Sequence, residues 1–349
     1  MEKTEKLLDD GKFALALVRL KKLGPADGPA ADRTLLKGEA LRGLGLFAAA
    51  IKEYRSARAS SAEELLRLEA LLGETRCHRA LGNEPQALSS AKKALALSKR
   101  TGEFEDDAKL EWALALRLTG RLAEAAKLLE LLLKNYRRCA DHDGAAFVLW
   151  ALGGLYRLQG RYAEGVRAFE DSLKLAKKAG DGAAEGYALF GLGGILRVAG
   201  FMGRSLGCYV RARRLFAATD DTFAKAYAEC GTANVLRQLG RLEEALAGYH
   251  RAHKLYSGLS DWADLGFVEW GMGEISRRGG DFGAALGHYR RAAGLFKGRG
   301  EPRGEALTLL SLSYLQYLKG ETVLAERTHS AALKFIRRHG LHTHLETFT

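Results

Sequence analysis

Arginine and aromatic residues recur at fixed spacings along this chain, and they are its candidates for recognition chemistry. A guanidinium group binds a carboxylate through two parallel hydrogen bonds, and an aromatic ring accommodates apolar side chains. Together they predict a site for a ligand that is both acidic and apolar. The candidate residues are Arg117, Arg157, Arg197, Arg237 and Arg277, the aromatics Phe147, Trp150, Tyr187, Phe190, Tyr227, Phe267 and Trp270, and Asn234.

Residue patterns that carry catalysis are absent from the sequence. It contains no HExxH, no P-loop and no complete GxGxxG motif. The string Gly203–Gly207 has the GxSxG pattern, but its Ser205 is the small residue that follows the hinge Gly200 by five positions in the repeat. His339, His342 and His344 gather near the C-terminus, but no acidic or cysteine ligand stands with them, so we expect no metal site there. The sequence therefore predicts a protein that is not an enzyme and that needs no cofactor or metal.

The elements that must position these residues are helical hairpins. Residues 147–175 predict two amphipathic helices joined at Gly160, because apolar and small residues recur every three or four positions on either side of it. A glycine suits such a junction, since it closes the last helical turn in a left-handed conformation. Gly153 and Gly165 are small enough to let the two helices approach closely.

The hairpin repeats along nearly the whole chain. The hinge glycines are separated by 34, 37 and 38 residues and then by 40 five times. A small residue follows each hinge by five positions, and in five copies an aromatic residue follows by nine. A fixed period of this length is typical of a helical solenoid. The hinges are Gly11, Gly45, Gly82, Gly120, Gly160, Gly200, Gly240, Gly280 and Gly320.

This pattern resembles the tetratricopeptide repeat, which has a Leu-Gly pair and a Tyr in its first helix, a hinge Gly, and then Ala, an aromatic residue and Ala. The matching residues here are Leu152, Gly153, Tyr156, Gly160, Gly165, Phe169 and Ser172. The 40-residue period departs from the usual 34 and is similar to the elongated repeats of animal spindle-orientation scaffolds and of some bacterial signalling regulators. The resemblance implies an all-α, right-handed α-solenoid of about eight and a half repeats that binds protein segments in a concave groove.

The predicted organisation has three parts. Residues 1–24 form a truncated capping repeat, residues 31–339 the array, and residues 340–349 a tail. From residue 141 onward an acidic residue precedes each first helix of a hairpin, where a carboxylate caps the free amides of the first turn. These residues are Asp141, Asp181, Asp221, Asp261 and Glu301. The last hairpin has no following helix, so either the tail folds back over it or a second copy or a partner covers it.

Two interpretations of the arginine positions compete. Each arginine stands three residues before a hinge, on the helix face that lines the groove in the resembling family. In the structural interpretation, each packs along the next helix and pairs with a carboxylate of a neighbouring repeat. In the functional one, the arginines and aromatics bind an extended or helical acidic-apolar segment of a partner. A row of equal charges requires acidic groups close by, and the two interpretations can hold together in part.

The net charge of +12 also indicates acidic partners, although basic and acidic residues alternate in most helices. The rival functions are binding of single-stranded RNA by the same residues, against which the row has almost no lysine, and a structural spacer in a larger assembly. No stretch is long and apolar enough to span a membrane. The cysteines, which are Cys77, Cys139, Cys208 and Cys230, lack CxxC spacing and predict buried free thiols in the cytoplasm.

Overall fold

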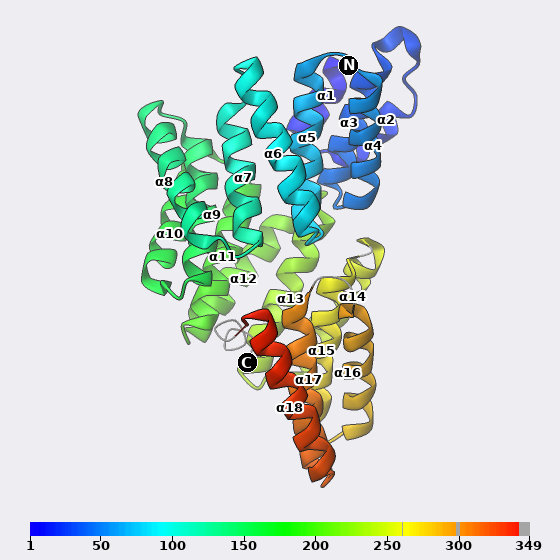
Figure 1. Ribbon diagram of the computed structural model, residues 1–349, viewed down its shortest axis with the longest axis vertical. Coiled ribbons are helices and arrows are strands. Elements are labelled where there is room, and N and C mark those ends of the chain that lie inside the picture. The colour runs from blue at the N-terminus through cyan, green and yellow to red at the C-terminus, as the bar shows by residue number, and fades with distance from the viewer. Residues whose placement is uncertain (260, 298–300, 342–349) are drawn as a thin grey trace. The chain divides into compact units, whose positions relative to one another are not determined.

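The chain is built from antiparallel helical pairs that follow one another in sequence (Figure 1). The computed structural model describes residues 1–259, 261–297 and 301–341, and within these ranges it contains helices and no strands. One short 3₁₀ helix, η1, spans Pro25–Asp27. The α-helices are α1 (Glu2–Asp9), α2 (Phe13–Leu20), α3 (Ala30–Gly43), α4 (Phe47–Ser60), α5 (Glu64–Ala80), α6 (Glu84–Thr101), α7 (Glu105–Leu118), α8 (Leu122–Arg138), α9 (His142–Leu158), α10 (Tyr162–Ala179), α11 (Gly182–Val198), α12 (Met202–Ala217), α13 (Thr222–Gln238), α14 (Leu242–Leu259), α15 (Trp262–Arg278), α16 (Phe282–Phe296), α17 (Pro302–Leu318) and α18 (Thr322–His339).

The odd-numbered helices are the first members of the hairpins, which we call A helices, and the even-numbered ones are the B helices. All nine predicted hinge glycines lie between an A helix and its B helix with φ between 68° and 86°. Any other residue is strained in this left-handed region, because its Cβ crowds the following carbonyl oxygen. The all-α solenoid of helical hairpins is therefore confirmed, and the glycine spacing located its turns.

The aromatic residue of the B helix fills the space between successive A helices. Phe169 of α10 is buried and lies against glycines on both α9 and α11. A Cβ atom added at Gly153 would lie 2.8 Å from the Phe169 ring, and one added at Gly191 would lie 2.1 Å from it. Tyr54, Tyr209, Tyr249 and Tyr289 are buried at the equivalent position. The two glycine-bearing A helices therefore form a slot that accepts one ring.

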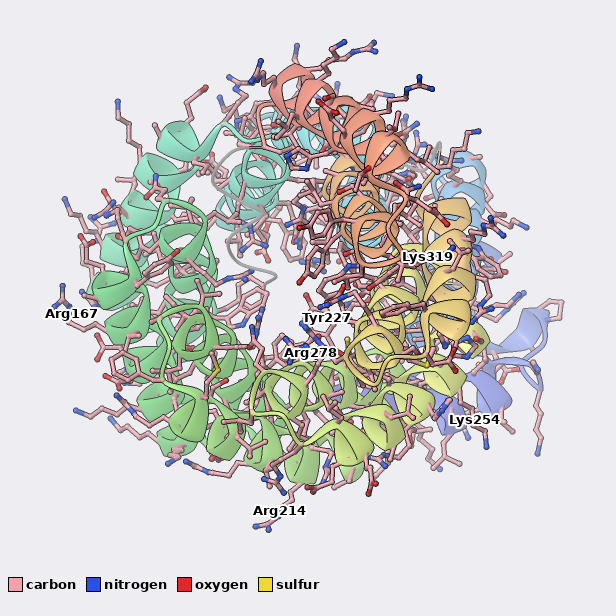
Figure 2. The ribbon with its side chains drawn as sticks, turned by 90° about the horizontal axis from the view of Figure 1, so that it is seen from below. Arg167, Arg214, Tyr227, Lys254, Arg278 and Lys319 are labelled. Carbon is pink, nitrogen blue, oxygen red and sulfur yellow. The ribbon has the colours of Figure 1, made fainter. Side chains whose placement is uncertain are left out.

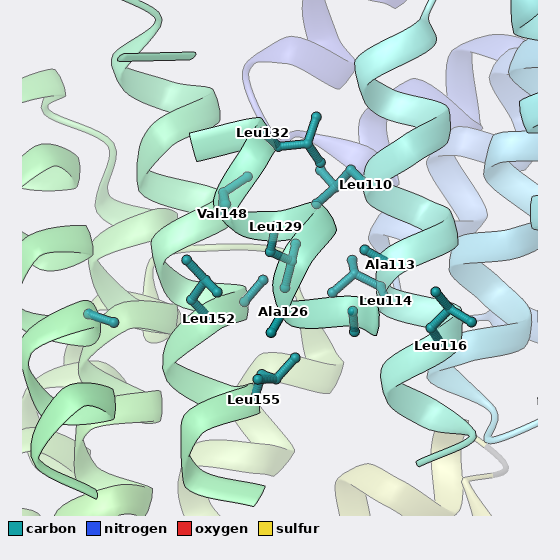
Figure 3. Close-up of a cluster of buried hydrophobic side chains, with 13 residues drawn as sticks. Leu110, Ala113, Leu114, Leu116, Ala126, Leu129, Leu132, Val148, Leu152 and Leu155 are labelled. Atoms are coloured by element: carbon teal, nitrogen blue, oxygen red, sulfur yellow. The ribbon is translucent and has the colours of Figure 1, made fainter. Parts of the chain in front are cut away.

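Leucine and alanine side chains fill the remaining space between A and B helices. The cluster in Figure 3 joins Leu110 and Leu114 of α7, Leu129 of α8, and Leu152 and Leu155 of α9. All five are at least 90% buried. Each hairpin therefore shares its core with the next, as expected when no repeat can bury its apolar face alone.

Aspartates cap the A helices as predicted. The carboxylate of Asp141 accepts a hydrogen bond from the N–H of Gly144 at 2.8 Å, and Asp181 accepts one from Ala184 at 2.9 Å. Asp221 and Asp261 do the same for Ala224 and Asp264. Glu301 precedes α17 without a side-chain cap.

The prediction of four buried thiols is wrong in part. Cys77 is buried in α5, Cys208 and Cys230 are half-buried, and Cys139 is exposed because it follows the last turn of α8. At the C-terminal end, Gly340 ends α18 in a left-handed conformation and Leu341 packs with Ala306 and Ile336. The rest of the predicted tail, with His342 and His344, lies outside the described residues. No helix in the described ranges is sufficiently long and apolar to cross a bilayer.

The chain divides into two compact units. The first contains residues 1–195 and 211–224, and the second contains residues 196–210 and 225–349 with the gaps given above. The candidate residues fall into both units, so their surroundings are described for each unit separately.

Candidate interaction face

The predicted site residues share one face of the A helices. In α9 this face carries Phe147, Trp150, Gly154 and Arg157, at spacings of three and four residues that one side of a helix presents together. We call these positions and their equivalents in other repeats the A-helix face. Figure 2 shows Tyr227 and Arg278 of the second unit on one side of the helices and Lys254 of α14 on the other.

In the first unit, three aromatic rings on α9 and α11 form a continuous row. The Phe147 and Trp150 ring centroids are 5.5 Å apart, and Trp150 and Tyr187 are 6.2 Å apart with nearly perpendicular planes. The indole N–H of Trp150 donates to the Tyr187 carbonyl oxygen at 3.2 Å. Phe147 is 42% exposed, whereas Trp150 and Tyr187 are half-buried. The row therefore begins at the surface and continues into the packing between repeats.

Tyr187 has a further structural role. Its ring packs edge-on against the buried Phe216, with centroids 5.1 Å apart, and its hydroxyl donates to Asp221 at 2.6 Å. Phe190, one turn along α11, is half-buried. These contacts fix the aromatic row with little freedom for rearrangement, which reduces the ordering cost of binding.

Arg117 of α7 reaches the A-helix face of the next repeat. Its guanidinium lies 5.9 Å from the centroid of the Trp150 ring. A Cβ added at Gly154 would come within 2.8 Å of Arg117 Nη1, so this glycine makes room for the arginine rather than for a ligand. Arg157 occupies the equivalent position on α9 and is half-buried. The first unit thus places the Arg117 cation beside Trp150, the middle ring of the aromatic row.

Earlier arginines of the row are neutralised within the protein. Arg42 binds Glu39, one turn earlier on α3, at 2.5 Å. Arg79 of α5 binds Glu111 of α7 at 2.8 Å, and Arg76 binds the same carboxylate at 3.2 Å. Burial raises the pKa of Glu111, but the guanidinium groups of Arg79 and Arg76 outweigh it, so the pKa is lowered overall. The pairs with Glu111 join two repeats and match the structural interpretation, whereas the Arg42–Glu39 pair lies within one helix.

In the second unit the predicted residues are more deeply buried. Arg237 of α13 is 2% exposed and its guanidinium lies 4.8 Å from the centroid of the Trp270 ring, which is itself 5% exposed. Arg237 Nε donates to the Tyr249 hydroxyl at 3.2 Å, and that hydroxyl donates to Asn234 at 2.7 Å. Asn234 therefore helps to fix the position of Arg237 indirectly, by holding the Tyr249 hydroxyl.

Glu274 organises the following turn of the second unit. It accepts hydrogen bonds from Arg277 at 2.7 Å, from the Tyr289 hydroxyl at 2.5 Å and from the Ser311 hydroxyl at 3.1 Å. Burial raises the Glu274 pKa, but these bonds and the nearby Arg237 charge lower it overall. Arg277 also lies 4.8 Å from the centroid of the Tyr314 ring, which is 49% exposed. Ser311 further accepts from the Trp270 indole at 2.8 Å.

The remaining candidates of the second unit lie close to the core. Arg197 is 8% exposed and its Nη1 is 3.5 Å from the side-chain oxygen of Gln238. Phe267 is half-buried and packs edge-on against Phe296 at 4.9 Å, and Tyr227 is half-buried. These buried and half-buried side chains support the A-helix face of the second unit by packing under its surface.

The sequence reasoning expected carboxylates near the arginines but did not assign the individual pairs. Glu39 and Glu274 stand three residues before Arg42 and Arg277, a spacing at which opposite charges meet on a helix. That signal was available in the sequence. Glu111 carried no such signal, because its partner Arg79 lies 32 residues away on another repeat.

A surface hollow of about 540 Å³ lies elsewhere in the first unit. It is lined by Gly120–Glu124 with Gln159 and Arg161, at the hinge end of the hairpins. Two exposed ion pairs, Arg121–Glu124 and Arg161–Glu164, stand at this end. It therefore does not coincide with the predicted face. No group of three or more His, Cys, Asp or Glu side chains in the described ranges is placed to hold a metal ion.

Comparison with known proteins agrees with this architecture. A family model described as tetratricopeptide repeat matches residues 106–178 and 225–298. A search of curated proteins gave no match. A solved Rap protein complexed with Competence and Sporulation Factor is 17% identical, with a TM-score of 0.67 over 83% of this chain and 82% of that one.

Two further solved structures are similar over most of their length. The apo form of the quorum sensor NprR from B. thuringiensis has a TM-score of 0.58 at 16% identity, over 96% of this chain and 99% of that one. The apo form of RapI has a TM-score of 0.54 at 14% identity, over 76% and 97%. At such identities the likeness concerns the fold. The segments 106–178 and 225–298 therefore match the tetratricopeptide repeat, and the chain shares the helical-repeat fold of these solved structures.

Proposed function

We propose that this chain is a non-enzymatic interaction module whose A-helix face binds an acidic-apolar peptide or helix of a partner protein. The observation that carries the proposal is the aromatic row of the first unit, which begins at the exposed Phe147 and continues to Trp150, where the Arg117 guanidinium lies 5.9 Å from the ring centroid. A row with an exposed aromatic ring at one end and a cation over its next ring offers both kinds of contact that such a segment needs.

The surroundings of the row support this assignment. Trp150 and Tyr187 are held by hydrogen bonds, so the face is ordered before a partner arrives. Two similar folds are named for a bound factor and for quorum sensing, which gives a precedent for ligand binding by this architecture. The same proposal places the protein in the cytoplasm, where unpaired cysteines such as Cys77 stay reduced.

The burial pattern also ranks the predicted binding residues. Phe147 and Arg157 are accessible in part, whereas Arg237 and Trp270 are almost completely buried. Direct contact with a partner is therefore assigned to the first unit, and Arg237 and Trp270 act by holding the face of the second.

Self-association through α18, which exposes Val323 and Leu324, remains part of the proposal.

The test is a binding screen against a library of peptides that combine acidic and apolar residues, with a 20-nucleotide single-stranded RNA as the competing probe. We expect Phe147→Ser and Arg157→Gln to weaken the selected peptide at least about tenfold, since each removes a central contact. Val323→Ser, at another exposed apolar position, on α18, is the control and should bind normally. Preferential RNA binding that Phe147→Ser abolishes would reject the peptide assignment.

A further inference from the structure

The positive charge of the chain is concentrated on the B helices. The nine B helices contain 28 lysines and arginines against 10 aspartates and glutamates, a surplus of 18. The nine A helices contain 17 basic and 19 acidic residues, a deficit of 2. The net charge of +12 therefore belongs to the opposite layer from the A-helix face, whose arginines were the candidates in the sequence.

A repeated arrangement of cations in the first unit lies on α8 and α10, which both pack against α9. Each carries three cations at the same repeat positions, 7, 14 and 18 residues after its hinge glycine. All six are exposed, and Figure 2 shows Arg167 directed away from the helices. We call them, together with Leu131, the outer basic face: Lys127, Lys134 and Arg138 on α8, and Arg167, Lys174 and Lys178 on α10.

The cations of this face are not neutralised inside the protein. None of the six forms an ion pair with a residue in the described ranges, in contrast to Arg42, Arg76 and Arg79 of the A helices. Arg138 hydrogen bonds to the neutral side chain of Asn135. The chain therefore uses buried carboxylates on the A-helix side and leaves the outer basic face with a surplus of charge.

An exposed leucine lies within the cations. Leu131 is 59% exposed and falls four residues after Lys127 and three before Lys134, so the three side chains share one stripe of α8. With Arg138 the stripe spans twelve residues, or about 16 Å along the helix at a rise of 1.5 Å per residue. A large apolar side chain surrounded by cations matches a partner that offers both carboxylates and an apolar group.

We propose that the outer basic face is a second interaction surface, which binds an acidic protein segment that also carries apolar side chains. Its geometry fits nucleic acid less well. Neither α8 nor α10 exposes an aromatic ring on which a base could stack. Glu130, Glu170 and Asp171 stand among the cations, where they would repel phosphates. Asp171 can pair with an occasional basic residue of a protein segment and set its register.

The test uses purified full-length chain and a fluorescent 20-residue peptide of glutamate with leucine at every fourth position. Polyglutamate of the same length and a 20-base-pair duplex DNA are the comparison probes. We expect the variant Lys134→Glu, Arg138→Glu, Lys174→Glu, Lys178→Glu to bind the leucine-containing peptide at least about tenfold more weakly, because four exposed attractions become repulsions. All four side chains are exposed, and circular dichroism verifies the fold.

A matched control separates this face from the general charge of the chain. The variant Arg327→Glu, Lys334→Glu, Arg337→Glu, Arg338→Glu changes the same number of exposed cations on α18. It should bind the peptide within about twofold of the unaltered chain. Leu131→Ser should weaken the leucine-containing peptide roughly fivefold and leave polyglutamate unchanged, because only the former buries the leucine.

Three outcomes would overturn the proposal. Equal losses in the two quadruple variants would mean that only net charge matters. Tighter binding of the duplex than of the peptide, lost in the α8–α10 variant, would identify a phosphate-binding surface. Absence of peptide binding by the unaltered chain would remove the surface altogether.

Discussion

The guanidinium of Arg237 stacks on the indole of Trp270 at 4.8 Å, although the two residues belong to successive repeats and are only 2% and 5% exposed. A buried cation is costly unless a compensating group is close. Here the compensation comes from the ring face, the Tyr249 hydroxyl and the nearby Glu274 charge. The same relationship links Arg117 with Trp150 and Arg277 with Tyr314. Arginine stacking across repeats is therefore a structural element of this array.

A double-mutant cycle should detect the Arg237–Trp270 contact. Arg237→Met and Trp270→Leu should each lower the free energy of unfolding, and the pair should show a coupling energy of about 1 to 2 kcal/mol, as expected for a desolvated cation–π contact. Urea denaturation followed by circular dichroism measures all three variants. A coupling below about 0.3 kcal/mol would mean that the two side chains pack independently.

Glu111 should make stability depend on pH. Its pKa is lowered in the folded state by Arg79 and Arg76, so its contribution is present above the unfolded pKa of about 4.3 and is lost as the pH falls through the folded value. Glu111→Gln should cost about 2 to 3 kcal/mol at pH 7, because it leaves two arginines without their carboxylate.

Chemical denaturation between pH 7 and pH 3 checks this expectation. The difference between Glu111→Gln and the unaltered chain should shrink on the acid side. Glu103→Gln, in the exposed turn before α7, is the control and should change stability by less than about 0.5 kcal/mol. A difference that stays constant down to pH 3 would show that the ionised carboxylate is not the stabilising species.

Substitution by alanine should change the stability of the protein very differently at two glycines of the first unit. Gly191→Ala would place its Cβ 2.1 Å from the buried Phe169 ring, so we expect a loss of about 2 to 3 kcal/mol. In Gly154→Ala the new Cβ meets only the end of the Arg117 side chain, which can move away. Alanine has a higher helix propensity than glycine by about 1 kcal/mol, and this gain should offset the cost of moving Arg117, so we expect little net change in stability. Thermal unfolding compares the two. Equal destabilisation would contradict the ring-slot description.

The hinge conformation predicts a further contrast. Gly160 has φ of 73°, and alanine there should cost about 1 to 2 kcal/mol. Gly294 lies within α16 with open space around its Cβ position, so Gly294→Ala should stabilise by up to about 1 kcal/mol. Unfolding in urea gives both values. A neutral Gly160→Ala variant would mean that the hinge readily adopts another turn.

The arginine row shows where sequence reasoning stopped. Its regular spacing predicted one face for all the arginines, and the helix boundaries place them there. The sequence left open whether each arginine binds a ligand or pairs with a carboxylate of a neighbouring repeat. Arg42 and Arg79 are paired with carboxylates, and Arg237 is buried, so these three stabilise the array. Phe147 and Arg157 retain access to a partner.

The sequence alone determined the hairpins, because a turn at glycine and the pattern of apolar residues depend on neighbours only a few positions away. Gly160 had to end its helix in a left-handed conformation, and Phe169 had to face small residues. The contacts between repeats needed the tertiary structure. Arg79 pairs with Glu111, which lies 32 residues later in the sequence, and the indole of Trp150 donates a hydrogen bond to the carbonyl oxygen of Tyr187, 37 residues later. Such pairs depend on how adjacent helices stack and which rotamers their side chains adopt, and no local spacing encodes either.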